Sequence, residues 1–391
     1  MSARIYFDNA ATTPVDPRVA QAMEPYWRQA FGNPSSLYRE GRESRGAVER
    51  ARSQVAALLH ARPEEIVFTA SGTEASNMAL VGVAEACGAD CHMITSAIEH
   101  PAVLETCRYL QRRGVAITQL PVTPEGIVEP AALIDALRPT TRLVSVMAAN
   151  NAVGTLQPLA ELARITREHG ALFHTDAVQA VGKIPVNVQT QAIDLLSLSA
   201  HKLHGPKGVG ALYVREGVAI EPLVHGGGQE QGRRSATENV AGIVGLGEAA
   251  RLAQAAMSDE AVRLVRLRDR IIDAICREIP NAYLLGDRYQ RLPGHVCLGL
   301  AGQEAEAIKL LLALDELGIA IASGSACSAN HAGQPSHVLV AMGRDPVHAR
   351  GSLRITLGRF NTEAEVDRLL EVLPRVAASL RPMTTRTFAS A

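Results

Sequence analysis

The sequence lacks the features of a membrane protein, a disulfide-rich secreted domain or a nucleic-acid-binding protein. No uninterrupted apolar segment reaches the roughly 18 residues that a spanning helix needs. The formal net charge is −1, so no overall field attracts nucleic acid or a membrane surface. Six cysteines in 391 residues do not make a disulfide framework and fit a reducing compartment. Residues 1–8 contain no basic stretch followed by an apolar one, so we expect a cytoplasmic protein without a secretory signal.

The sequence also gives no sign of an intrinsic metal centre. Cys87, Cys91 and His92 lie close together, but no second ligand pair has suitable spacing, so we interpret them as packed or surface residues. Cys276 and Cys297 lie in apolar, regularly patterned stretches, and we expect both to be ordinary packed thiols.

The middle of the chain alternates between segments typical of helices and of strands. Apolar runs over 93–95, 115–120 and 143–147 predict strands, and the patterns over 72–86, 101–110 and 159–168 predict helices. This alternation is typical of an α/β fold, in which a mostly parallel sheet is covered by helices on both faces.

A domain boundary is predicted near Met257, where an alanine-rich stretch gives way to a charged amphipathic segment. At roughly 150 residues per domain, the length suggests two or three domains. We therefore predict a large domain that ends at residue 257 and a smaller C-terminal α+β domain over 258–391. A basic cluster after the boundary forms either a solvated helix face or a docking face for a partner: Arg263, Arg266, Arg268 and Arg270.

Lys202 is the most informative single residue. It follows the apolar run 193–198 and precedes Gly205-Pro206, so it lies on a short turn between two buried strands. Partial desolvation there lowers the pKa of a lysine amine and makes it a usable nucleophile. Ser199 and His201 supply donors for a phosphate beside it. The pattern suggests a lysine that forms a Schiff base with pyridoxal phosphate (PLP); by itself it also suits a solvated turn lysine.

Asp176 and the segment around Gly72 add to this interpretation. Asp176 ends the apolar run 171–175, at the strand end where α/β sheets bind ligands. A carboxylate there can keep the pyridine nitrogen of PLP protonated, although it could instead cap a helix. Ser71-Gly72-Thr73-Glu74 follows an apolar run and opens a helix. Backbone N–H groups and the Thr73 hydroxyl would form a phosphate site there; the alternative is a simple N-cap.

Cys327 lies in a segment of small residues, 323–330. A thiol on such a loop is unusual, because free cysteine is normally buried. Small residues favour a mobile loop, and the nearby His331 would favour the thiolate. The segment therefore suits a thiol that works first against a buried cofactor and then against an external acceptor.

Together these residues resemble the NifS/IscS-type cysteine desulfurases, PLP enzymes of fold-type I in the class V aminotransferase family. The similarity runs from Tyr6-Phe7-Asp8-Asn9-Ala10-Ala11-Thr12-Thr13-Pro14 to Leu353-Arg354-Ile355-Thr356-Leu357-Gly358-Arg359-Phe360. Between these, the matching residues occur in order: Gly32 to Ser36, Ser71 to Glu74, Glu99-His100, Asn150-Asn151, Asp176 with Gln179, Ser199 to Lys202, Thr237 and Cys327.

The resemblance implies roles for further residues. It implies that His100 stacks on the pyridine ring and takes part in catalysis, and that Gln179 hydrogen-bonds the phenolic oxygen of PLP. Asn151 would face the substrate and the cofactor, and Arg354 would clamp the substrate carboxylate with its planar fork. Thr237 would reach the phosphate of the partner subunit's cofactor, which implies a homodimer.

The implied organisation is a large PLP-binding domain over 16–257, with residues 1–15 joining 258–391 in a small domain that bears the cysteine loop. The implied reaction removes sulfur from L-cysteine and leaves L-alanine. Lys202 would remove the Cα proton, and Cys327 would attack the sulfur and hold it as a persulfide. The sulfur would then pass to a sulfur-acceptor or iron–sulfur scaffold protein, and Cys327 could serve as a transient iron–sulfur ligand. No direct contact with nucleic acid or membrane is expected.

The chain departs from the family pattern at four places. Ala152 stands where glutamate is usual, Tyr38 where histidine is common, and Ala236 where glycine precedes Thr237. The Cys327 loop is one residue longer before Pro335. None of these changes removes a group with an assigned chemical role.

Two other kinds of function stay open at this point. A selenocysteine lyase or a cysteine sulfinate desulfinase would share the fold, and selenide elimination can proceed without a cysteine nucleophile, so dependence on Cys327 discriminates. A non-catalytic scaffold for sulfur-handling partners would need none of Lys202, Asp176 and Cys327. A PLP aminotransferase would have no use for the loop thiol.

Overall fold

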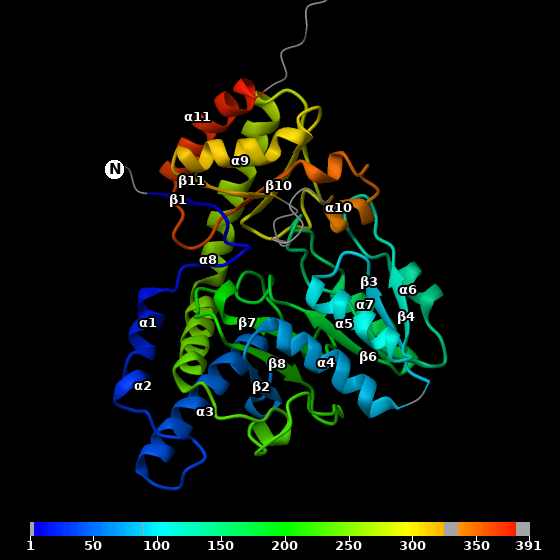
Figure 1. Ribbon diagram of the computed structural model, residues 1–391, viewed down its shortest axis with the longest axis vertical. Helices are drawn as coiled ribbons and strands as arrows, with labels where there is room; N and C mark the ends of the chain where they lie inside the picture. Colours follow the sequence, from blue (N-terminus) through cyan, green and yellow to red (C-terminus); the bar gives the residue numbers. More distant parts are fainter. Residues whose placement is uncertain (1–3, 89, 324–334, 381–391) are drawn as a thin grey trace, which may run out of the picture.

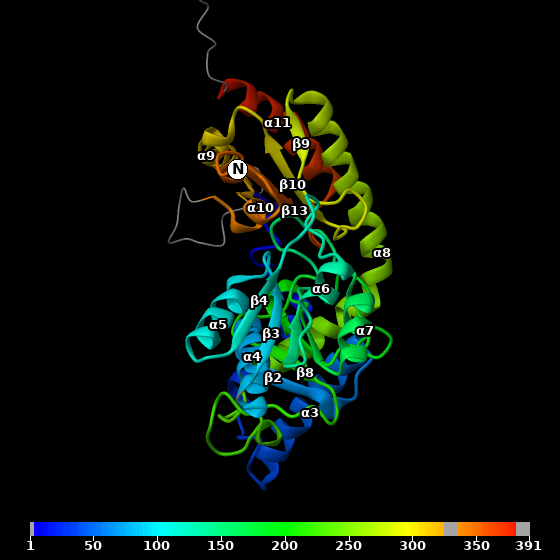
Figure 2. The same cartoon turned by 90° about the vertical axis from the view of Figure 1, so that its right-hand side faces the viewer.

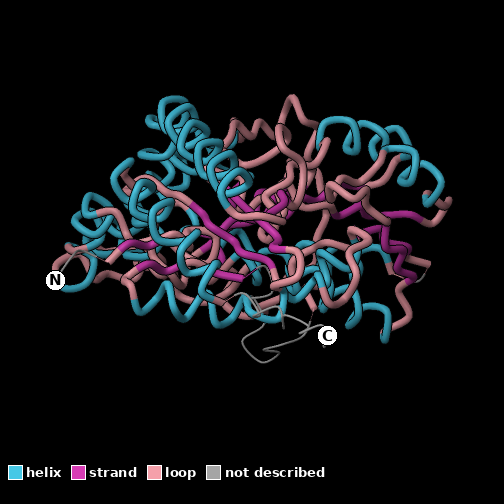
Figure 3. Tube along the Cα trace, turned by 90° about the horizontal axis from the view of Figure 1, so that it is seen from above, coloured by secondary structure: helices cyan, strands magenta, loops and turns pink. Residues whose placement is uncertain are grey.

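The computed structural model describes residues 4–88, 90–323 and 335–380. A seven-stranded sheet occupies the lower part of Figure 1, and a separate four-stranded sheet lies above it. Figure 3 shows that the strands run through the interior, with helices outside them.

The large sheet has the order β2-β8-β7-β6-β5-β3-β4, and β8 is its one antiparallel member. The mostly parallel sheet confirms the expected α/β fold. Strands of such a sheet that are buried on both faces have nearly continuous apolar sequences. The strands are β2 (Ile66–Thr69), β3 (His92–Ser96), β4 (Ala116–Leu120), β5 (Thr141–Ser145), β6 (Leu172–Asp176), β7 (Leu195–Ser199) and β8 (Gly210–Val214).

Alternate residues of these strands face two different cores. Met93, Leu143 and Leu195 pack with α4 (Gly72–Cys87) and α5 (Pro101–Arg112). Ile94 and Phe173 face the other side of the sheet, where they pack against a second group of helices. Those helices include α1 (Pro17–Met23), α3 (Arg39–Leu59), α7 (Leu159–His169) and the start of α8 (Val240–Glu278). The short helices α2 (Pro25–Arg28) and α6 (Pro130–Ala136) complete this part of the molecule.

The expected helices are confirmed to within two residues at each end, but the strand predicted over 143–147 is displaced. It runs from Thr141 to Ser145. Val146 and Ala148 still donate backbone hydrogen bonds to His174 and Asp176 of β6, so the chain follows its neighbour beyond the regular ladder. The apolar run continues because these residues are buried, whether or not they are in the strand.

The smaller sheet is antiparallel, in the order β12-β13-β10-β9. Its core also contains Ile5 and Phe7 from the start of the chain. The elements are β9 (Ala282–Leu284), β10 (His295–Leu300), β12 (Ala322–Ser323), β13 (Ser352–Thr356), α9 (Ala307–Glu316), α10 (His337–Ala341) and α11 (Glu363–Ser379). Nearby, β1 (Ile5–Tyr6) pairs with β11 (Ile319–Ala320). The packing of residues 5–7 supports their placement in the small domain, which stays a proposal.

Helix α8 runs without a break through the proposed boundary at residue 257, and Figure 2 shows it alongside both parts of the molecule. Its residues up to Ala253 belong to the core of the large sheet, and those from Leu264 onward belong to the small core. We therefore still propose a division at this point, but the two parts share one helix of about 58 Å.

The basic cluster on α8 is not a bare cationic surface. Arg263, Arg266 and Arg270 pair with Glu260, Glu363 and Asp367 in turn. Arg268 is buried and donates to backbone carbonyls of residues 291 and 292. Because acidic partners offset most of this charge, the cluster gives no support to the docking alternative.

One cysteine prediction is wrong and one is confirmed. Cys297 is fully buried in β10, but Cys276 is exposed on α8. The helical period places residue 276 beside the exposed positions 273 and 277, on the face away from the core.

Among the residues that the structure describes, no helix is both long enough and apolar enough to cross a membrane.

Four histidines are buried, and burial lowers the pKa of each: His92, His174, His204 and His295. The pKa falls to about 4 for His92 and to about 3 for His174. At pH values below the ordinary histidine pKa near 6.5, the unfolded chain therefore binds protons that the folded chain does not. The free energy of unfolding consequently decreases as the pH is lowered. Glu99 acts in the opposite sense, because burial raises its pKa to about 8.

Replacing His174 by glutamine should reduce this loss of stability in acid. The ring nitrogens lie 2.8 and 2.9 Å from the hydroxyls of Ser145 and Ser197, and an amide can replace part of that bonding without titrating. Between pH 6.5 and 5.5, the variant should lose about 1 kcal/mol less unfolding free energy than the unmodified protein, measured by urea denaturation. His225→Gln, at an exposed loop position, is the control; equal losses for His174→Gln and the unmodified protein would contradict the assignment.

Candidate active site

A cavity of about 580 Å³ lies at the carboxyl ends of β6 and β7 and at the amino end of α4. Open α/β sheets bind ligands at this edge. Eleven of the residues predicted from the sequence, or their direct neighbours, line it: Ser71, Gly72, Thr73, His100, Asn151, Asp176, Gln179, Ser199, His201, Lys202 and Arg354. The cavity therefore brings together segments more than 280 residues apart in the sequence.

Lys202 lies at the end of a 3₁₀ turn, Ala200–Lys202, directly after β7. Its amine donates hydrogen bonds to the carbonyl oxygens of Ala10 and Ala11, the latter at 2.7 Å. The turn lies between β7 and β8, which are both buried, so the expected short turn between two buried strands is confirmed. The Lys202 side chain is half-buried. The amine is thus held at the cavity wall by the N-terminal segment.

Asp176 ends β6 and is buried. One carboxylate oxygen accepts the backbone N–H of Val178 at 3.0 Å, and within the described ranges no lysine or arginine forms an ion pair with it. Burial raises the pKa of Asp176, while His100 and Lys202 oppose that rise. A buried carboxylate facing a cavity with no salt-bridge partner there fits a cationic ligand group, such as a protonated pyridine nitrogen.

His100 caps the start of α5, where its Nδ1 accepts the N–H of Ala102 at 3.1 Å. Burial lowers the pKa of His100, with the nearby Asp176 acting against it. A neutral ring that accepts at Nδ1 has its proton at Nε2. Its position at the cavity fits a ring that packs against a planar ligand.

The amino end of α4 also lines the cavity. The Ser71 hydroxyl accepts the N–H of Glu74 at 3.0 Å, so Ser71 is the N-cap. Gly72 lies so close to the end of β7 that a Cβ atom there would be 2.6 Å from Val178 Cγ2 and 3.3 Å from Ser199 Cβ. Thr73 is exposed and lines the cavity. A helix amino end that lines such a cavity fits a phosphate.

Gly72→Ala should therefore lower the affinity for PLP at least about tenfold, because the added methyl group would displace the turn that we predict to bind the phosphate. Fluorescence titration of the cofactor-free protein with PLP measures this. Gly46→Ala, inside α3 where the nearest atom is 3.4 Å away, is the matched control and should bind PLP normally. Equal PLP affinities for the two variants would exclude Gly72 from the phosphate site.

Arg354 is fully buried and is already engaged by the protein. Its guanidinium donates to Asp8 at 2.8 Å and to the Asn151 carbonyl at 3.0 Å. Asp8 belongs to the N-terminal motif, but no pattern in the sequence assigns it a role. A buried arginine needs an acidic partner, so the sequence-based prediction could have included a carboxylate for Arg354. Sequence alone does not say which acid that partner is.

Gln179 and His201 also have protein partners. Gln179 donates from Nε2 to the Ala10 carbonyl at 2.9 Å. His201 Nδ1 lies 3.1 Å from the Thr12 hydroxyl, and burial lowers the pKa of His201 to about 4. A neutral His201 beside Ser199 can still donate one hydrogen bond to a phosphate.

Two predicted site residues are not placed in the cavity. Thr237 is exposed and does not line it. Its neighbour Ala236 has φ of +131°, a value that favours the glycine usual at that position. Cys327 lies outside the described residues. The described residues on either side of that gap approach the cavity: Ser323 pairs with Leu353 beside Arg354, and His337 bonds the Glu99 carbonyl at 3.0 Å.

His92, which lies next to Cys91 in the sequence, is held by hydrogen bonds to its neighbouring strands. Both ring nitrogens of His92 bond threonine hydroxyls, at 2.8 Å to Thr141 and 2.9 Å to Thr118. In the described part of the chain, no group of three or more His, Cys, Asp or Glu side chains could hold a metal ion.

Comparison with known proteins gives a consistent result. The model of the family "Aminotransferase class-V" matches residues 5–369. A protein of Dictyoglomus turgidum named cysteine desulfurase IscS is 48% identical over 385 residues, which cover 98% of this chain and 97% of the relative. A protein of Methanosarcina thermophila with the same name is 48% identical, covering 98% and 94%.

Solved structures agree with these relatives. A NifS-like protein superimposes with a TM-score of 0.89 and 39% identity, covering 96% of this chain and all of its own. A NifS-like protein from Rickettsia africae gives 0.86 and 31%, with coverages of 96% and 99%. The structure described as SspA in complex with cysteine gives 0.81 and 35%, with coverages of 92% and 100%.

Proposed function

The chain belongs to the class V aminotransferase family and is a cysteine desulfurase of the NifS/IscS type, and from that premise we propose how its own residues perform the reaction. Family membership implies PLP. When bound, PLP accepts the negative charge that develops at the substrate Cα when its proton leaves. The observation that supports this proposal most directly is that Lys202, Asp176 and His100 face one cavity.

The cavity walls would hold PLP in one orientation. The amino end of α4, with Ser199 and His201, would bind its phosphate. Asp176 would pair with the protonated ring nitrogen, and His100 would pack against the ring face. Gln179 would donate a hydrogen bond to the phenolic oxygen. The residues present therefore fit the cofactor's anionic end, its cationic nitrogen and its flat ring.

Lys202 would bind the cofactor covalently at rest and act as the base after L-cysteine enters. Its Nζ would take the proton from the substrate Cα and later return a proton to the product. Asn151 and Arg354 would bind the substrate carboxylate; Arg354 is already oriented by Asp8, which limits the entropy lost on binding. The buried position of Arg354 strengthens its attraction for a carboxylate.

Cys327 would be the sulfur acceptor. Its thiolate would attack the substrate sulfur, so that a Cys327 S–S bond forms while the substrate C–S bond breaks. The electron pair of that bond stays with the carbon skeleton, which is protonated and leaves as L-alanine. The positions of Ser323 and His337 beside the cavity support this role, because they flank the segment that bears Cys327.

A sulfur-acceptor or iron–sulfur scaffold protein would then remove sulfur from the Cys327 persulfide. The working unit would be a homodimer, in which the exposed Thr237 completes the phosphate site of the partner subunit. Light scattering at assay concentration tests this: a dimer is expected, and a fully active monomer would contradict it.

The activity is tested by incubating the purified PLP-bound protein with L-cysteine and a thiol reductant. We expect alanine and sulfide in equal amounts. Alanine at the same rate from a Cys327→Ser variant would favour a lyase mechanism. The formation of pyruvate and ammonia in place of alanine would exclude desulfuration by thiol attack.

A further inference from the structure

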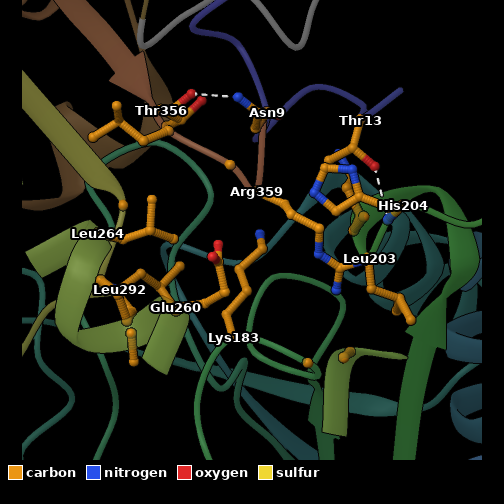
Figure 4. Close-up of a pocket in the computed structure, with 18 of the residues that line it drawn as sticks. Asn9, Thr13, Lys183, Leu203, His204, Glu260, Leu264, Leu292, Thr356 and Arg359 are labelled. Atoms are coloured by element: carbon orange, nitrogen blue, oxygen red, sulfur yellow. Dashed lines mark hydrogen bonds between the residues drawn. The ribbon is translucent and has the colours of Figure 1, made fainter. Parts of the chain in front are cut away.

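A second, smaller cavity of about 60 Å³ adjoins the cavity of about 580 Å³ described above, which is the proposed PLP cavity. Lys202 and Ala10 line both cavities. The smaller one lies between the two cores, and Figure 4 shows the Lys183 amine and the Glu260 carboxylate extending into it. Nothing in the reaction described above uses Lys183.

Lys183 is joined to Lys202 by a continuous chain of hydrogen bonds. Its amine donates to Gln179 Oε1 at 3.1 Å. Gln179 Nε2 donates to the Ala10 carbonyl at 2.9 Å, and the Lys202 amine donates to the same carbonyl. Ala10 is thus a shared acceptor for the lysine and the glutamine of the proposed active site.

This arrangement decides which way the Gln179 amide faces. A glutamine amide has one accepting end and one donating end, and a carbonyl such as that of Ala10 can only accept. An ammonium group can only donate, so Lys183 in its protonated form requires the Oε1 end of Gln179. If the amide turned over, its NH₂ group would face the Lys183 ammonium, and its oxygen would face the Ala10 carbonyl.

The backbone keeps Lys183 in reach of Gln179. Residues 177–184 form consecutive tight turns, in which Ala180 accepts the N–H groups of Lys183 and Ile184. Gly182 has φ of +78°, and a Cβ atom there would be 3.1 Å from Ala253 Cβ on α8. A bulkier residue would push this turn away from α8 and take the Lys183 amine with it.

On the basis of the role proposed above for Lys202, we propose that Lys183 is a positioning residue for the reaction. It fixes the Gln179 amide so that the NH₂ group points toward Ala10 and the proposed PLP cavity. Through the shared Ala10 carbonyl, it also places the Lys202 amine.

Lys183 changes its charge in the neutral range, which provides a readout. Burial lowers the pKa of its amine to about 7, and Lys202 and Arg354 contribute in the same direction. The other charged or titratable groups that face it come from the neighbouring turns, α8 and β10: His201, His204, Glu260, His295 and Arg359. The positive charge of Lys183 disfavours a further proton on the Lys202–cofactor unit.

The test is the pH titration of the visible band of bound PLP in Lys183→Met. Its midpoint should rise by at least about half a pH unit, a threefold change in proton affinity, because a positive charge and the hold on Gln179 are both lost. kcat/KM for L-cysteine should fall about tenfold. Lys309→Met removes an exposed charge on α9 and should change neither quantity. If Lys183→Met does not fold, Lys183→Gln also removes the charge and is read in the same way.

A double-mutant cycle with Gln179→Leu separates positioning from a general structural effect. Because Lys183 acts through Gln179, the kcat/KM losses of Lys183→Met and Gln179→Leu should not add. Additive losses, or an unchanged midpoint in Lys183→Met, would overturn the proposal. The absence of a borohydride-reducible visible band at Lys202 in the unmodified protein would instead refute the proposed function, so the two failures are distinguishable.

Discussion

Lys202→Ala should abolish desulfuration, with a fall in kcat of at least about 10³-fold. In the proposed mechanism the amine is both the covalent attachment point and the base, and loss of a positioned base alone costs about 10²- to 10⁴-fold. Borohydride treatment of the unmodified protein should fix the cofactor to the peptide that contains Lys202, and Lys202→Ala should show no fixed cofactor. Absorbance spectra and peptide mass spectrometry provide the measurements.

Lys207 is the matched control for this experiment, because it is another lysine at the wall of the same cavity. It is exposed and follows the Gly205-Pro206 turn, outside the 3₁₀ turn that holds Lys202 against Ala10 and Ala11. We expect no cofactor on the Lys207 peptide. Cofactor found there, and absent from the Lys202 peptide, would overturn the assignment of the catalytic lysine.

Cys327→Ser should bind PLP normally yet release almost no sulfide from L-cysteine, with a loss of at least about 10²-fold. A hydroxyl at pH 7 cannot replace a thiolate as the nucleophile toward sulfur. After a single turnover of the unmodified protein, mass spectrometry should find one extra sulfur on the Cys327 peptide. Near-normal alanine production by the variant would favour the selenocysteine lyase alternative.

Two other cysteines provide controls of different kinds. Cys276 is exposed, so Cys276→Ser tests whether any accessible thiol can accept sulfur; it should retain full activity. Cys297 is buried, and burial raises the pKa of its thiol to about 11. Cys297→Ser should therefore remain active, apart from a loss of stability due to the hydroxyl in an apolar core.

The sequence was sufficient for the parts of the site that depend on strand ends. Lys202 and Asp176 each follow an apolar run that had to be a buried strand, and parallel strands bring their carboxyl ends to one edge. Gly72 was found for a similar reason, because a strand leads into a helix amino end there. These positions follow from local patterns, which a single sequence records well.

The sequence was not sufficient where a contact joins distant segments. The Asp8–Arg354 ion pair spans 346 residues, and neither residue has a local pattern that points to the other. Lys183 resembled any polar residue in a turn until Gln179, Ala10 and Lys202 were placed around it. Cys276 was assigned to the interior because its neighbours are apolar, yet the phase of one long helix turned it outward.

The unbroken path of α8 has a mechanical consequence. A hinge needs a few residues that can change φ and ψ freely, and residue 257 lies in the middle of a helix whose hydrogen bonds forbid it. The two cores therefore cannot swing apart about the boundary that the sequence suggested, and a protease that cuts only extended backbone finds no site there. Any change in the shape of the proposed PLP cavity must bend α8 or occur in the shorter connections around it. We then expect the two cores to unfold together, because α8 contributes side chains to both and its melting removes them from both.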